Sequence, residues 1–262
     1  MVLLLRPLPY SAPWCTIAGI ALLGALLNSC KHETPEAPQQ PAVPVFTVQQ
    51  RLALDWRYGS HTYKSGSVYE DDLGHAYQLD TLRFLISNAQ AVDDDGAVLA
   101  SYSSVYALAD AAGSNAFLLG DLTSDHLHEI KFSIGVEPTI NHGDPALAPA
   151  SLNSMGMHSG NAAAGYSFLT VAGRVDSNGD GTIDNNDQRF SYNCIGDALL
   201  CPAAAVVHAN LPENGALTAW LPVDIKILMA NIDLLNTPNT SDDGPVNMAW
   251  MQRLMDSMEQ EH

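Results

Sequence analysis

From residue 45 onward, the sequence consists of short alternating apolar runs separated by turns rich in Asp, Gly and Asn. Such runs are typical of β-strands, because successive side chains point to opposite faces of a sheet. No long helical pattern intervenes before the last forty residues. We therefore predict a mainly β domain over residues 45–262, folded as an antiparallel β-sandwich or a barrel-like sheet. The predicted strands cover residues 46–56, 82–92, 104–108, 130–136, 166–175, 190–192 and 216–223.

A few helices are expected near the C-terminus. Residues 224–235 and 245–259 have apolar residues at helical spacing. In the second segment, methionines recur every three or four residues, at Met248, Met251, Met255 and Met258. A Met-rich surface can bind copper, but a Met stripe at helical spacing is usually a packed face. We therefore predict a packed or partner-docking helix there.

The N-terminus has the pattern of a bacterial lipoprotein signal peptide. Arg6 precedes an uninterrupted apolar run at residues 16–27, which is too short to span a bilayer. The run leads into Leu-Asn-Ser-Cys, so residues 1–29 are the predicted signal peptide and Cys30 the predicted lipidation site. An ordinary cleaved signal is the alternative. Residues 30–44 contain four prolines and are predicted to be a tether. Lipid anchoring would place the protein in the bacterial cell envelope, on the outer membrane or facing the periplasm.

The net charge of −18 and the cysteines narrow the function classes further. An acidic chain without a basic stripe is not expected to bind nucleic acid. Cys194 and Cys201 are separated by six residues and follow a predicted export signal, so we expect a disulfide; two free thiols that bind metal are the alternative. No Gly-rich phosphate loop, Gly-x-Ser-x-Gly elbow or catalytic Cys/His order is present, so we expect a protein that is not an enzyme.

A twelve-residue segment at 176–187 matches a calcium-binding loop of the EF-hand or dockerin type. Its predicted oxygen ligands are Asp176, Asn178, Asp180, Thr182, Asp184 and Asp187. Gly181 stands where such a loop turns sharply, and Thr182 would bind through its carbonyl. Asp187 stands where Glu is usual, so Mg²⁺ would compete with Ca²⁺. The alternative is an acidic hairpin turn that binds no ion.

Four motifs, in this order, resemble the MbnP-like copper-binding family over residues 45–262. They are residues 82–88 (LRFLISN) with Asp-Gly at 95–96, residues 130–136 (IKFSIGV) with Asn141, residues 165–174 (GYSFLTVAGR), and residues 190–192 (FSY) with Ile-Gly at 195–196. The resemblance implies a β-rich fold and copper bound by histidines and an oxidised tryptophan, which a dihaem peroxidase-like partner produces. In this chain, Asn193 stands at the family's histidine, and residues 159–164 (SGNAAA) lack the tryptophans.

Other side chains are therefore the candidate copper ligands. Met155, Met157 and His158 combine thioethers with an imidazole, which suits Cu(I). His126 and His128 alternate in a strand-like run and are predicted to share a face. We expect a lipid-anchored copper-handling protein, with a dihaem peroxidase-like protein or an outer-membrane receptor as partner. The alternative is a surface structural or interaction lipoprotein whose bound ion is Ca²⁺.

Overall fold

The computed structural model describes residues 45–113, 115–161 and 163–258. The predicted signal peptide, the tether and Cys30 lie outside these residues. The strands are β1 (Phe46–Tyr58), β2 (His61–Thr62), β3 (Val68–Glu70), β4 (Ala76–Val92), β5 (Val98–Tyr102), β6 (Ala107–Asp110), β7 (Ala116–Ser124), β8 (His126–Ile134), β9 (Ser167–Val175), β10 (Gln188–Ile195), β11 (Cys201–Asn210), β12 (Ala216–Asp224) and β13 (Thr240–Asp242). The helices are α1 (Pro138–Asn141), η1 (Pro145–Leu147), α2 (Ala150–Asn153), η2 (Asp197–Leu199), α3 (Ile225–Leu228) and α4 (Pro245–Asp256).

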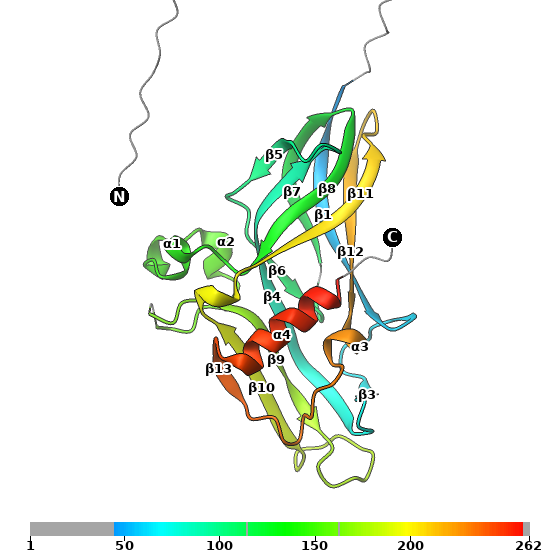
Figure 1. Cartoon of the computed structure of the whole chain (residues 1–262), viewed down its shortest axis with the longest axis vertical. Helices are drawn as coiled ribbons and strands as arrows, with labels where there is room; N and C mark the ends of the chain where they lie inside the picture. The colour runs from blue at the N-terminus through cyan, green and yellow to red at the C-terminus, as the bar shows by residue number, and fades with distance from the viewer. Residues whose placement is uncertain (1–44, 114, 162, 259–262) are drawn as a thin grey trace, which may run out of the picture. The chain divides into compact units, whose positions relative to one another are not determined.

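The described strands form two sheets, as Figure 1 shows. The smaller sheet has the order β12-β1-β2, with β7 also paired to β1. The larger sheet has the order β11-β8-β4-β9-β10-β13, and β3, β5 and β6 pair with β4. Most pairs are antiparallel, whereas β1–β12 and β10–β13 are parallel. The predicted mainly β sandwich is confirmed, and the sheets do not close into a barrel.

The core lies between the sheets and takes alternate residues of the long strands. In β9, burial alternates from Leu169 onward, and Leu169, Val171 and Val175 are fully buried. Gly173 is required in the same strand, because a Cβ atom there would lie 2.1 Å from the Gln78 carbonyl oxygen of β4. Close approach of two strands thus fixes the centre of the larger sheet, and β8 is held next to β4 on its other side.

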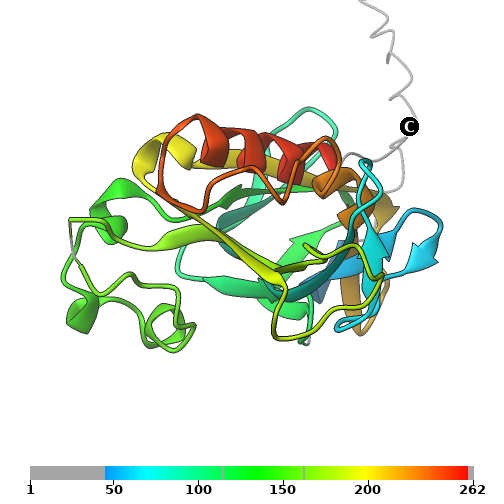
Figure 2. The ribbon, with the colours of Figure 1, turned by 90° about the horizontal axis from the view of Figure 1, so that it is seen from below.

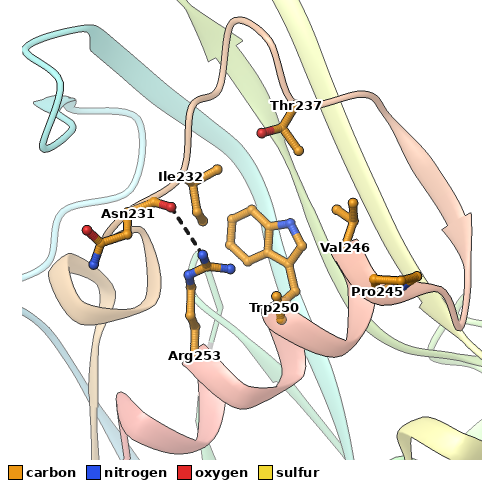
Figure 3. Close-up of a pocket in the computed structure, with 8 residues that line it drawn as sticks. Asn231, Ile232, Thr237, Pro245, Val246, Trp250 and Arg253 are labelled. Atoms are coloured by element: carbon orange, nitrogen blue, oxygen red, sulfur yellow. Dashed lines mark hydrogen bonds between the residues drawn. The ribbon is translucent and has the colours of Figure 1, made fainter.

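The C-terminal segment contains a long helix and a short one. Helix α4 agrees with the predicted helix, although it ends at Asp256. The helix predicted over residues 224–235 is largely wrong, since α3 covers only Ile225–Leu228. Asn231 adopts a left-handed φ of 56°, which ends helical geometry. Figure 3 shows this turn facing α4, where the Arg253 guanidinium donates to the backbone oxygens of Ala230 and Asn231.

The predicted disulfide between Cys194 and Cys201 is not formed, and both residues are free thiols. The Cys194 sulfur donates to the Asn247 carbonyl of α4 at 3.7 Å, whereas the Cys201 sulfur donates to the Leu199 carbonyl of η2 at 3.1 Å. Burial raises the pKa of both thiols. Each sulfur therefore has a backbone partner of its own, one in α4 and the other in η2. Among the described residues, no helix is long and apolar enough to cross a membrane.

Candidate metal centre

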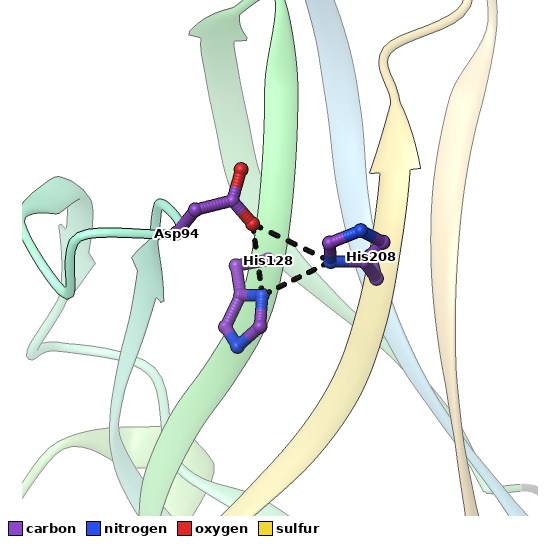
Figure 4. Close-up of side chains that lie close together, drawn as sticks. All are labelled: Asp94, His128 and His208. Atoms are coloured by element: carbon purple, nitrogen blue, oxygen red, sulfur yellow. Dashed lines mark hydrogen bonds and ion pairs between the residues drawn. The ribbon is translucent and has the colours of Figure 1, made fainter. Parts of the chain in front are cut away.

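Three neighbouring parts of the larger sheet bring histidines and a carboxylate together at one end of β8. His126 and His128 stand two residues apart on β8, and the strand places both on one face. On one side, β11 contributes His208. On the other side, Val92 of β4 pairs with Glu129, so the turn that follows β4 brings Asp94 next to His128. Figure 4 shows Asp94, His128 and His208 converging from these three segments.

A β-bulge aims His208 at the cluster. Val206 pairs with Glu129 and Ala209 pairs with Leu127, so Val207 and His208 together oppose His128. His208 takes a left-handed φ of 44°, which is rare for a residue with a Cβ atom. Such strain persists only where the surrounding structure imposes it, and it concentrates at functional sites.

One oxygen of Asp94 is the focus of the cluster. Its Oδ1 atom lies 3.0 Å from His128 Nδ1, 3.4 Å from His208 Nδ1 and 3.5 Å from His126 Nε2. The two Nδ1 atoms of His128 and His208 are 3.2 Å apart. Three imidazole nitrogens therefore surround one carboxylate oxygen, but only the donor atoms of Asp94, His128 and His208 all lie within 4.8 Å of one another, and His126 is outside that group. Exposure differs, because the His126 side chain is 23% exposed and that of His208 is 66% exposed.

The His126 ring is held through one nitrogen, while its other nitrogen lacks a hydrogen-bond partner. Its Nδ1 atom pairs with Asn210 Oδ1 at 3.1 Å, which fixes the ring. Its Nε2 atom is buried and has no hydrogen-bond partner, although it faces Asp94 Oδ1. A buried polar atom without a partner is costly, whereas a ligating imidazole usually has its second nitrogen held in this way. The Asn210–His126 contact is thus the outer support that a metal ligand requires.

The spacing of the donor atoms fits a transition-metal ion. Metal–nitrogen bonds of about 2.0 Å place tetrahedral donors about 3.3 Å apart. Asp94 Oδ1 lies 3.0 Å from His128 Nδ1 and 3.4 Å from His208 Nδ1, and these two nitrogens are 3.2 Å apart, so a cation could enter among them with small side-chain rotations. Imidazole nitrogens with a carboxylate oxygen suit Cu(II) and Zn²⁺ better than Ca²⁺ or Mg²⁺. Among the described residues, Asp94, His128 and His208 are the three-ligand group whose donor atoms lie within 4.8 Å.

The other predicted copper ligands lie elsewhere. Tyr166, the bridge partner of His158, immediately precedes β9, whereas the histidine cluster is at the His126 end of β8. His158 stacks edge-on against Tyr166, with ring centres 4.7 Å apart, and its Nδ1 accepts from the Gly160 amide. Met157 is buried in the core, and Met155 packs against it. The structure therefore unites His126 with His128 and separates the Met155–His158 group from them.

Two members of the cluster were not predicted. Asp94 belongs to an Asp-rich stretch of the kind that predicts a turn, and it lies in the turn after β4. His208 lies in a segment that was not predicted to be a strand. In the sequence, His208 is a single histidine outside any predicted strand. Nothing near it shows that β11 pairs with β8 and brings it to His128.

The predicted calcium loop forms the connection between β9 and β10. Asp176 and Asp187 are buried where the two strands meet, and the loop's own amides bind their carboxylates. Hydrogen bonds, first from the Gly181 amide, lower the pKa of Asp176. The hydroxyl and amide of Thr182 both donate to Asp180 and lower its pKa.

The remaining predicted ligands of this loop are exposed. Asn178 donates to Asp180 through its side chain, and Asp184 accepts from the Asn186 amide. The loop's aspartates are not among the groups of three or more converging acidic, His or Cys ligands in the described part of the chain. Calcium binding by residues 176–187 therefore stays a prediction.

Comparison with known proteins agrees with the sequence motifs. No curated protein matches this chain. A solved structure, MbnP from Methylosinus trichosporium, is 16% identical, with a TM-score of 0.47, and the alignment covers 77% of this chain and 82% of that one. The family model named MbnP matches residues 47–248, which is most of the described domain. The chain therefore belongs to the MbnP family.

Proposed function

We propose that this protein is a non-enzymatic, lipid-anchored copper-binding protein of the cell envelope, and that it holds copper at Asp94, His126, His128 and His208. The observation that carries the proposal is the convergence of three imidazole nitrogens on Asp94 Oδ1 within 3.5 Å. Membership of the MbnP family supports a copper-related role. The nitrogen and oxygen donors favour the divalent ion, Cu(II).

The family's own ligand positions support a changed location for the metal. Asn193, which stands at the family's histidine, lines the same cavity as His158. That cavity has a volume of about 340 Å³, and His158 is the one imidazole among the residues that line it. One imidazole, with its Nδ1 already bound to a backbone amide, is a poor transition-metal site. The group of Asp94, His128 and His208, with His126 beside Asp94, is the better candidate.

The test is a titration of purified soluble domain with Cu(II), followed by desalting and metal analysis. The wild-type protein should retain one equivalent, and the His128→Ala/His208→Ala double variant should retain none. His61→Ala is the matched control, because His61 is an exposed histidine outside the cluster. Retention by the double variant, or loss in the control, would contradict the assignment.

The remaining parts of the proposal concern location and partners. The predicted lipid at Cys30 would hold the domain on the envelope membrane by its acyl chains. An exposed His208 at the rim of the site suits exchange of the ion with a partner protein, for which a dihaem peroxidase-like protein or an outer-membrane receptor is proposed. Copper transfer between purified partners would test this role.

A second candidate function is a structural or interaction lipoprotein that binds Ca²⁺ at residues 176–187. Buried Asp176 and Asp187 at the base of the hairpin favour it, because a cation there would tie β9 to β10. Metal analysis after growth with both metals separates the two functions: calcium without copper supports the second, and copper lost with the histidine variant supports the first.

A further inference from the structure

A cavity beside α4 is lined mainly by sulfur-bearing side chains. Its volume is about 140 Å³, and four of its seven lining residues are Cys201, Met248, Met251 and Met255. The remaining three are Ala198, Leu199 and Gln252. No Asp, Glu or His lines this cavity, so its donor set differs completely from that of the histidine cluster.

The fold places these sulfurs together from two segments. Met248, Met251 and Met255 stand at positions i, i+3 and i+7 of α4, so they form one stripe along the helix. Cys201 begins β11, directly after the short η2 turn, and η2 packs against α4. Figure 2 shows the yellow segment that contains η2 lying beside the red helix α4.

The stripe is only partly a packing face. Met251 is buried at 2% exposure, but Met248 is 49% exposed and Met255 is half-buried. Because Met248 is half-exposed, its packing stabilises the fold little. The side chains of α4 that are most deeply buried in the core are Trp250 and Leu254. The exposed Met248 gives an ion a route from solvent to the more buried sulfurs.

We propose that this cavity is a second metal site, selective for a soft monovalent cation, Cu(I). Thioethers and thiolates select soft ions, whereas the absence of carboxylates and imidazoles from the cavity wall disfavours Cu(II), Ca²⁺ and Mg²⁺. The three thioethers bind without losing a proton. In the metal-free protein, the Cys201 thiol donates its proton to the Leu199 carbonyl. When the metal ion binds, the thiol loses this proton to solvent and the thiolate sulfur bonds to the ion. Flexible methionine side chains can adjust to the ion.

The site is independent of the proposed Cu(II) cluster, and the two have different donor atoms. A protein with both would bind each oxidation state of copper at its own place. The inference therefore goes beyond the proposed function, and it stands if the histidine cluster binds nothing.

The test is an anaerobic titration with Cu(I) in competition with bicinchoninate, repeated with Ag⁺ as a redox-inert probe. The wild-type domain should bind one equivalent, and X-ray absorption should show sulfur neighbours at about 2.3 Å. Met248→Leu/Met255→Leu should weaken binding at least tenfold, because leucine keeps the volume and removes the sulfurs. Met258→Leu is the matched control, since Met258 is buried close by in sequence but outside the cavity.

Cys201→Ser and the histidine double variant complete the design. Cys201→Ser should also weaken Cu(I) binding, while His128→Ala/His208→Ala should leave it unchanged. The inference is overturned if bicinchoninate removes all Cu(I) from the wild-type protein, if the methionine variant binds as tightly as Met258→Leu, or if Cu(I) is lost with the histidines instead.

Discussion

Replacing His208 by glycine should relieve backbone strain at the histidine cluster and, at the same time, remove a proposed copper ligand. A residue with a Cβ atom in the left-handed region costs about 1–2 kcal/mol. Glycine at φ 44° avoids that cost. Its greater conformational freedom in the unfolded chain, however, lowers the folding stability by about 0.5–1 kcal/mol. The side chain is 66% exposed, so little packing is lost. We expect the metal-free His208→Gly variant to be more stable than the wild type by about 0.5 kcal/mol.

The matched control is Ala209→Gly, one residue further along the same strand. Ala209 has an ordinary φ, so glycine there should destabilise the domain by about 0.5–1 kcal/mol. For a domain of this size, 1 kcal/mol shifts Tm by about 2–4 °C, so the two variants should differ by about 2–6 °C in thermal melts monitored by circular dichroism. If His208→Gly melts as low as Ala209→Gly, the bulge holds no strain and the reasoning fails.

The same variant should lose its response to copper. A ligand that binds only the folded state stabilises it by RT ln(1 + [L]/Kd), which is about 2.7 kcal/mol at a hundredfold excess over Kd. We expect Cu(II) to raise the Tm of the wild type and of Ala209→Gly, but not that of His208→Gly. An equal rise in all three proteins would show that copper binds elsewhere.

The remaining predictions address the loop, the anchor and the core. Calcium should raise Tm, and Asp176→Ala should abolish the rise; a melt indifferent to EDTA would exclude the site. Because backbone hydrogen bonds lower the pKa of Asp176 in the folded state, its carboxylate stabilises the fold above its ordinary pKa of 3.8 and loses this effect as pH falls below that value. The stability difference between wild type and Asp176→Asn without calcium should therefore shrink from pH 6 to pH 3 in urea melts. Cys30→Ser should release the protein from membranes and prevent fatty-acid labelling; an unchanged membrane fraction would refute lipidation. Asn141→Leu should cost about 1–3 kcal/mol, measured by urea denaturation, because it leaves the buried Tyr166 amide without its acceptor; a loss below 0.5 kcal/mol would refute that role.

The sequence predicted the sandwich because its strands carry a clear alternation of buried and exposed residues. It did not predict β11, because Pro202 and a run of three alanines have low β propensity. Pairing with β8 across the sheet imposes the strand conformation there. The same override of local preference shortened α3, since Asn231 takes a left-handed φ of 56° and ends the helical geometry before the buried Ile232 and Leu234.

The candidate metal centre was accessible to sequence reasoning only in part. The two-residue spacing of His126 and His128 places them on one face, as the structure has them. Asp94 and His208 come from 32 positions before and 82 positions after His126, and their approach depends on strand order and on a bulge. Local spacing contains no information about either. The methionine stripe was similarly interpreted as packing, because η2 and Cys201 complete its cavity only in three dimensions.

The most direct test of the central claim is a crystal structure of the domain grown with Cu(II), with anomalous data collected on both sides of the copper absorption edge. We expect one strong anomalous peak about 2.0 Å from His128 Nδ1 and His208 Nδ1, with Asp94 and His126 completing the site. A peak in the cavity between His158 and Asn193, with no peak at the histidine cluster, would contradict it.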